Sequence, residues 1–445
     1  MEGGARERLL GEEAEVEEGL GRRLWKENKK LWVVAGPSIF TRFSTFGVTV
    51  ISQAFVGHIG STELAAYAVV STVLMRFANG ILLGMASALE TLCGQSYGAK
   101  QYHMLGIYLQ RSWIILCACA LLLTPIFIFT TPLLKLLGQE ESIAEMAGTV
   151  AHWFIPVFFS FLNLGLAGVM GSMILAMWIP VMGQLAFVCF GGCPETWTGF
   201  SFTAFLDLWA IVKLSLSSGV MLCLELWYNT ILVLLTGHMK NAEVAIDALS
   251  ICLNINGWEM MISVGFLSAA GVRVANELGA GSAKAAKFAI VNVVITSFAI
   301  GFVLFLFFLF FRGRLAYIFT DDAEVARAVD DLSPLLAFSI LLNSIQPVIS
   351  GVAIGAGWQG MVAFVNIGCY YLIGIPLGVV LGYCFDLHVK GIWIGMLIGT
   401  CIQTLVLIYI TWRTNWDQQV LLAKDRLSKW YTHKSRKPND AHGSA

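Results

Sequence analysis

The sequence predicts an all-α polytopic membrane protein, and three observations carry this prediction. Hydrophobic residues make up 57% of the 445 residues and charged residues 13%, whereas soluble domains have roughly 45–50% and about 25%. A large share of the charge lies near the two ends of the chain, and long apolar runs recur between them. This composition excludes an ordinary soluble enzyme. The net charge of −1 gives no indication of a nucleic-acid partner.

Eleven runs are long and apolar enough to be spans, because a bilayer core of about 30 Å requires about 20 apolar residues per helix. They are 32–56, 65–90, 107–134, 146–162, 164–190, 208–236, 245–269, 286–311, 328–352, 361–384 and 391–412. From these runs we predict five regions along the chain. They are a cytoplasmic tail over 1–30, a shortened amino-terminal bundle over 31–192, a linker over 193–207, a six-helix carboxyl-terminal bundle over 208–412 and a cytoplasmic tail over 413–445.

The charges near the two ends conflict with an odd number of spans. Lysine and arginine residues close to spans favour the cytoplasmic side. Both end segments are rich in them, including Arg22, Arg23, Arg413 and Lys424. Two cytoplasmic ends require an even number of spans, and eleven is odd.

An internal repeat places the missing span in the first half. Gly57-His58 recurs as Gly237-His238, and Gly98-Ala99 recurs as Gly279-Ala280, at an offset of about 180 residues. Two halves in the same order are a parallel repeat, which predicts two bundles related by a pseudo-two-fold axis along the membrane normal. The second half has six predicted spans and the first has five. Between 146 and 192 two apolar runs follow each other almost without a loop. Either residues have been lost there, which we favour, or one run does not cross.

Glu225 is the strongest candidate for chemistry, because it lies mid-span among apolar neighbours. A charge in lipid costs several kcal/mol, so such a group usually faces water or a partner. A buried carboxyl that water reaches can bind and release protons, as a proton-coupled carrier requires. The alternative is a permanently protonated acid that bonds a neighbouring helix.

Polar residues of nearby spans could line a cavity with Glu225. The candidates are Asn229, Asn254, Asn256, Glu259, Asn343 and Gln346 in the second half, Gln53 in the first, and Tyr228 as an aromatic surface for an organic molecule. Amide bonds that join helices structurally are the alternative. Pro37, Pro347 and Pro376 mark positions where spans could bend.

The sequence contains no recognisable enzyme, cofactor or metal constellation. The histidines are scattered, there is no nucleotide-binding P-loop, and no nucleophile has an identifiable base. We therefore expect an ion gradient as the energy source, and neither a cofactor nor a metal.

Five stretches together resemble the plant-type branch of the multidrug and toxic compound extrusion (MATE) family. They read QAFVGHIGSTELAAYAV, ALETLCGQSYGAKQY, RVANELGAGSAKAAKFA, SIQPVISGVAIGAGWQ and GIWIGMLIGTCIQT. The resemblance implies two six-helix bundles, alternating access, and export of small organic compounds or xenobiotics in exchange for protons. It also implies a vacuolar or plasma membrane, substrates such as flavonoid-type metabolites, and a monomer.

Residue by residue, the resemblance makes Glu225 the match of the family's seventh-helix carboxylate. Asn343 stands where some members have an aspartate in helix ten. Against that pattern the chain lacks about one helix: the end of helix four, helix five and the start of helix six. The alternative function is therefore a shortened isoform that does not transport and acts by association with complete relatives. A channel or lipid scramblase is a third and weaker hypothesis.

Overall fold

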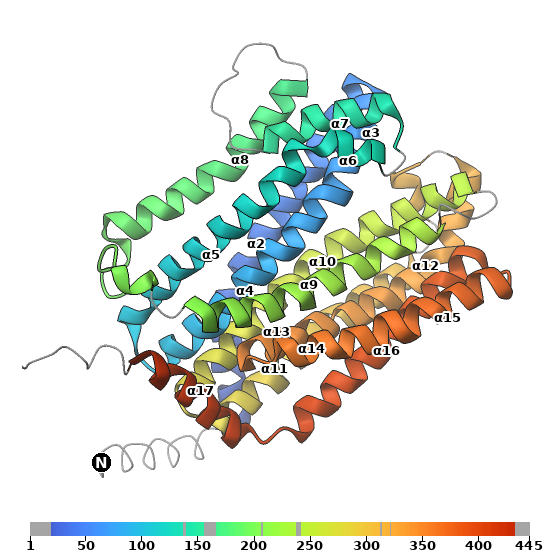
Figure 1. Cartoon of the computed structure of the whole chain (residues 1–445). Coiled ribbons are helices and arrows are strands. Elements are labelled where there is room, and N and C mark those ends of the chain that lie inside the picture. Colours follow the sequence, from blue (N-terminus) through green and yellow to red (C-terminus); the bar gives the residue numbers. More distant parts are fainter. Residues whose placement is uncertain are drawn as a thin grey trace, which may run out of the picture.

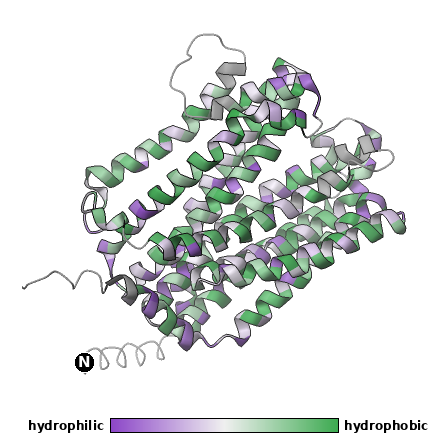
Figure 2. Cartoon of the chain, viewed as in Figure 1, coloured by the Kyte–Doolittle hydropathy of each residue, from purple (hydrophilic) through white to green (hydrophobic). Residues whose placement is uncertain are grey.

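The computed structural model describes residues 19–136, 139–154, 166–205, 208–236, 242–311, 314–320 and 322–431. These residues form helices, and no strand occurs among them (Figure 1). Ten of the helical stretches in the described ranges are long and apolar enough to cross a membrane. Hydrophobic residues cover most of the helix lengths, and hydrophilic ones gather around α17 (Figure 2). The predicted class, an all-α polytopic membrane protein, is confirmed.

The first bundle consists of the helices before residue 193. They are α2 (Leu20–Ile59), α3 (Ser61–Val69), the π-helical η1 (Val70–Met75), α4 (Arg76–Gly98), α5 (Tyr102–Ile128), α6 (Thr130–Leu136), α7 (Glu141–Phe154), α8 (Leu166–Phe187) and the π-helical η2 (Val188–Gly192). A short 3-10 turn, η3 (Phe202–Phe205), follows before the second bundle. Figure 1 shows α8 at the edge of the molecule, where it contacts α2 and α7.

The second bundle holds the remaining spans and ends in a helix that lies across their ends. It comprises α9 (Leu208–Thr236), α10 (Ala242–Gly279), α11 (Ala283–Phe310), η4 (Ala316–Ile318), α12 (Ala323–Asn343), α13 (Gln346–Ala356), α14 (Gln359–Asn366), η5 (Ile367–Gly374), α15 (Ile375–Val379), η6 (Val380–Cys384), α16 (His388–Arg413) and α17 (Trp416–Tyr431). Side chains cap two of these helices, because Ser282 accepts from the Ala285 amide and Asp322 from the Glu324 amide.

The number of long apolar helices in the described ranges bears on the conflict over charge. The second bundle has the six predicted spans, and the described part of the first has four. The predicted span 146–162 is represented by α7, which contacts α3 and α6. Residues 155–165 of that prediction lie outside the described residues. The described ranges hold ten helices long enough to cross, close to the predicted eleven, and ten is an even number, as two ends on one side require.

The segment between the bundles lies at the same end as α17. The Gln110 side chain, near the start of α5, donates to the Gly199 carbonyl over 2.9 Å. A Cβ atom at Gly106 would overlap the Thr196 carbonyl oxygen. The helix α17 in turn contacts α10, α11 and α4. The chain therefore returns to its starting side before the second bundle begins.

Close helix contacts depend on small residues. A Cβ atom at Gly84 of α4 would overlap the backbone of Gly219 in α9. Small residues let membrane helices approach closely, since dispersion and not the hydrophobic effect drives their association. By contrast, only 6% of an apolar 18-residue stretch within Met170–Gly192, which covers most of α8 and all of η2, is buried, against 56% of such a stretch within Ala248–Gly279. The helix α8 is thus held by few neighbours in this chain.

Candidate functional site

Glu225 contacts the first residue of α13, the second helix of the broken span Ala323–Ala356. The Gln346 side-chain nitrogen donates to the Glu225 carboxylate over 2.7 Å. Gln346 is buried, and Glu225 is partly buried. Tyr371 of η5 donates to the carbonyl of Leu224 over 3.0 Å. The turn of α9 that carries Glu225 is therefore held between α13 and η5.

A second polar group surrounds Glu259 on α10. The Ser263 hydroxyl donates to one carboxylate oxygen over 2.7 Å, and the Asn343 amide donates to the other over 3.2 Å. The same Asn343 nitrogen donates to the Asn256 side-chain oxygen over 3.0 Å. Both amide hydrogens of Asn343 are thereby used. The structure thus brings Asn256, Glu259 and Asn343 together.

The two groups are separated by a break in one span. Asn343 ends α12 and Gln346 begins α13. Pro347, the second residue of α13, has no N–H to donate to the Asn343 carbonyl, which interrupts the helical ladder. The carbonyl of the next residue, Ser344, accepts from the Ser297 hydroxyl of α11 over 2.7 Å. Pro347 therefore lies at the break between α12 and α13, a kind of position that proline favours.

Tyr228 lies in the packing between helices, one turn after Glu225 on α9. Its hydroxyl donates to the Met396 carbonyl over 2.8 Å, and its ring stacks on Tyr370 with 4.2 Å between centroids. The side chain is 3% exposed. These contacts give Tyr228 a structural role between α9, η5 and α16.

The remaining predicted residues do not join the two polar groups. Asn254 and Gln53 are exposed on α10 and α2. Pro37 lies inside the continuous helix α2, and Pro376 is the second residue of α15, which follows the π-helical η5. The side chain of Asn229 lies outside the described part of the structure.

The bundles are joined at the α17 end by buried hydrogen bonds. From α4, Thr91 donates to the Ile354 carbonyl over 2.6 Å, and Gln95 donates to the Gly355 carbonyl over 3.1 Å. Gln359 of α14 donates to the Thr91 hydroxyl over 2.9 Å. The carbonyls belong to the last turn of α13, whose first residue contacts Glu225.

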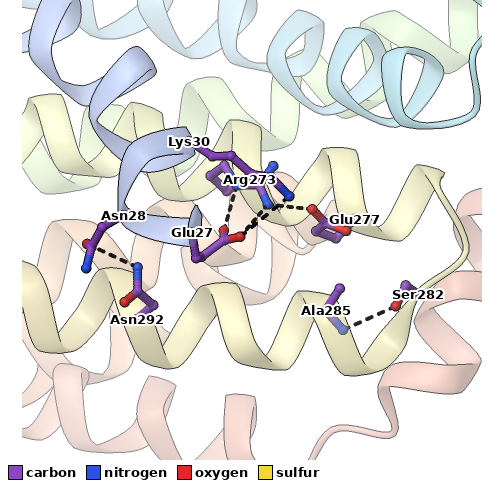
Figure 3. Close-up of polar contacts among 8 residues, drawn as sticks. All are labelled: Glu27, Asn28, Lys30, Arg273, Glu277, Ser282, Ala285 and Asn292. Atoms are coloured by element: carbon purple, nitrogen blue, oxygen red, sulfur yellow. Dashed lines mark hydrogen bonds and ion pairs between the residues drawn. The ribbon is translucent and has the colours of Figure 1, made fainter. Parts of the chain in front are cut away.

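A buried ion-pair cluster reinforces the same end. The Arg273 guanidinium of α10 donates to both carboxylate oxygens of Glu27 on α2, over 2.8 and 3.0 Å, and it also pairs with Glu277 (Figure 3). Asn292 of α11 donates to Asn28 over 3.3 Å. Sequence reasoning missed this cluster. The available signal was Glu277 four residues after Arg273, on the same helix face.

Comparison with known proteins identifies the family of this closed two-bundle arrangement. The family model described as MatE matches residues 37–182 and again 218–380. The double match coincides with the repeat. The chain belongs to the MATE family.

Close relatives of this MATE transporter come from Arabidopsis thaliana. Protein DETOXIFICATION 21 is 58% identical, with 96% of this chain and 95% of the relative covered. Protein DETOXIFICATION 20 is 57% identical, with 96% of each covered. Both alignments extend over 469 positions, more than the 445 residues of this chain. The relatives therefore carry internal residues that this MATE transporter lacks.

Solved structures have the same fold. The crystal structure of the eukaryotic MATE transporter AtDTX14 matches with a TM-score of 0.84 at 30% identity, covering 91% of this chain and 99% of that one. The Vibrio cholerae MATE transporter VcmN in the bent form matches with a TM-score of 0.73 at 16% identity, covering 90% and 98%. The chain is a multi-pass membrane protein of the MATE transporter fold.

Proposed function

We propose that this MATE transporter exports organic compounds or xenobiotics in exchange for protons by alternating access, with Glu225 as the proton-coupling group. The observation that carries the proposal is the 2.7 Å hydrogen bond from Gln346 to Glu225. It joins an acid in the middle of one span to the break in another. We also propose flavonoid-type metabolites among the substrates, the vacuolar or plasma membrane as the location, and a monomer.

Gln346 suits an acid that changes its protonation state. Its amide group has donors and an acceptor, so it can donate to the carboxylate and accept from the protonated acid. A charge in a span is expensive unless it faces water or a partner. If the partner were a basic side chain, protonation of the carboxyl would leave that cation buried without a counter-charge. An amide partner avoids this cost.

The helix α13 links Glu225 to the closed end. Its first residue, Gln346, contacts Glu225, and its last turn accepts from Thr91 and Gln95 of the other bundle. Hydrogen bonds to a charged group are stronger than those to a neutral one. Protonation of Glu225 would weaken its hold on α13, and a shift of α13 would disturb the contacts between the bundles. Protons and opening would be coupled in this way.

The second candidate function is the shortened isoform that does not transport. Three observations favour it: the relatives' additional internal residues, the four described spans of the first bundle, and the low burial of α8. Such a chain would act by associating with complete relatives. Lack of transport together with co-purification would support it.

Uptake by proteoliposomes under an imposed pH gradient tests the proposed function. The probes are ethidium, a fluorescent organic cation, and a quercetin glucoside. The variants are the unchanged chain, Glu225→Gln, and Glu145→Gln as a matched control on an exposed acid of α7. We expect gradient-driven uptake by the unchanged chain and the control, and none by Glu225→Gln. Equal uptake by all three would refute the role of Glu225.

A further inference from the structure

Glu225 and Glu259 are attached to opposite sides of the same helix break. Asn343, the last residue of α12, donates to Glu259, and Gln346, the first residue of α13, donates to Glu225. Only Ser344 and Ile345 separate the two amides. We propose that Glu259 is a second proton-coupling carboxylate, and that Glu225 and Glu259 together control this break. The inference rests on the proposed function and adds a second proton site to it.

Glu259 has the surroundings of a group that exchanges a proton. It lies between Trp258 and Met260 on α10, and its side chain is 5% exposed. Its two hydrogen-bond partners in the described structure, Ser263 and Asn343, are neutral. A buried carboxylate without a cation partner carries a large desolvation cost. Neutral partners can accommodate both forms of the acid, because the hydroxyl and the amide each offer donors and an acceptor.

The helices packed on α10 carry charged groups at several levels. Within the described helices that contact α10, they include Arg42 of α2, Arg76 and Glu90 of α4, Glu225 of α9 and Arg327, Asp330 and Asp331 of α12. At this level α12 and α13 present the amides of Asn343 and Gln346. The second bundle therefore has two acids at the break and amides between them.

The break is suited to move because its backbone is only partly held. Pro347 cannot supply the helical hydrogen bond to the Asn343 carbonyl. A Cβ atom at Gly301 of α11 would overlap Ser344, so α11 lies directly against the break. Hinges are commonly a few residues at element ends that absorb backbone change. Asn343 and Gln346 are held by side-chain hydrogen bonds to Glu259 and Glu225. The strength of each hydrogen bond depends on the charge of its carboxyl group.

Each proton releases one side of the hinge. A proton on Glu259 removes the charge that strengthens the bond from Asn343, and so loosens α12 from α10. A proton on Glu225 does the same for α13 and α9. The step forms an O–H bond on each carboxyl and breaks no covalent bond of the chain. Transport should therefore require two protons that act cooperatively.

Moving the carboxyl across the hydrogen bond tests this inference. The Glu259→Gln variant removes the acid, and the Glu259→Gln/Asn343→Asp variant restores one on the other side of a 3.2 Å contact. The matched control is Glu259→Gln/Asn254→Asp, which adds an acid at an exposed position of the same helix. Gradient-driven ethidium uptake is measured in proteoliposomes, and unfolding temperature and gel-filtration profile report folding.

We expect uptake to fall about tenfold in Glu259→Gln, to return to within about twofold in the swap, and to stay low in the control. Full uptake by Glu259→Gln, with none by Glu225→Gln, would overturn the inference and leave the proposed function standing. Full uptake by both variants would overturn the proposed function as well.

An infrared titration tests the second proton site without relying on transport. In the Glu90→Gln/Glu225→Gln variant, Glu259 keeps its carboxyl while two other acids of the described spans lose theirs. Difference spectra between mildly acidic and mildly alkaline buffer should keep one buried carboxyl band, which Glu259→Gln then removes. Absence of that band in the double variant would overturn the inference, whatever the flux.

Discussion

Gly98 of α4 and Gly279 of α10 make reciprocal contacts between the bundles, each with the backbone of the other helix. A Cβ atom at Gly98 would overlap the Asn276 carbonyl oxygen, and one at Gly279 would overlap that of Gln95. Gln95 and Asn276 are separated by the same offset as the two glycines. The contact therefore follows the pseudo-two-fold relation that the repeat predicts, and it lies where the bundles close.

Adding a methyl group at this contact should destabilise the closed end. We expect Gly98→Ala and Gly279→Ala each to cost about 1–3 kcal/mol, because the added carbon meets backbone that cannot yield. Thermal unfolding in detergent measures the effect. The matched control is Gly183→Ala on α8, where nothing lies within 4 Å of the new atom. Equal unfolding temperatures for all three variants would contradict the reciprocal contact.

Removing the cation of the buried cluster should be more costly. Arg273→Gln leaves Glu27 buried without its guanidinium partner, which typically costs about 3–5 kcal/mol. Lys135→Gln serves as the control, since its pairs with Glu141 and Glu145 are exposed. Chemical denaturation of the two variants compares the effects. A loss of stability no greater in Arg273→Gln than in Lys135→Gln would show that the cluster does not hold α2 to α10.

The helix α17 should stabilise the end of α13. Arg426 donates to the Ala356 carbonyl over 2.9 Å, and burial lowers the pKa of its guanidinium. Hydrogen bonds to charged groups contribute about 1.5–3 kcal/mol. Arg426→Ala should lower the unfolding temperature, whereas Lys424→Ala, at an exposed position of the same helix, should not. Hydrogen exchange of the α13 amides locates the effect, and unchanged exchange would contradict it.

Tyr228 should matter for stability and not for coupling. Tyr228→Phe removes the bond to the Met396 carbonyl and keeps the ring stacked on Tyr370. We expect a loss of about 1 kcal/mol and unchanged dependence of uptake on the pH gradient. Altered pH dependence, with the fold intact, would put Tyr228 in the coupling site.

The sequence was most informative where a residue type is rare in its surroundings. An isolated acid such as Glu225 stands out in an apolar span, and helical spacing put Asn256 and Glu259 on neighbouring positions. Which helices meet could not be read from spacing, because it depends on how each helix is rotated. For this reason spacing alone did not tell which cavity candidates contact Glu225; the structure places Tyr228 in helix packing and Asn254 on an exposed face.

Charged residues near the ends of spans were the hardest to interpret. Glu27 falls in the predicted cytoplasmic tail over 1–30, and Arg273 follows the predicted span 245–269, where charged residues commonly lie. The structure buries both in the contact between α2 and α10. The count of spans is limited for a related reason: hydropathy finds apolar runs such as that around α7, but it does not tell whether they cross.

Proton movement driven by substrate tests the central claim most directly. Proteoliposomes loaded with a pH-sensitive dye receive an ethidium gradient and no imposed pH gradient. We predict that ethidium movement drives an opposite proton flux by the unchanged chain, and that Glu225→Gln gives no flux. A proton flux of the same size in Glu225→Gln would contradict the account.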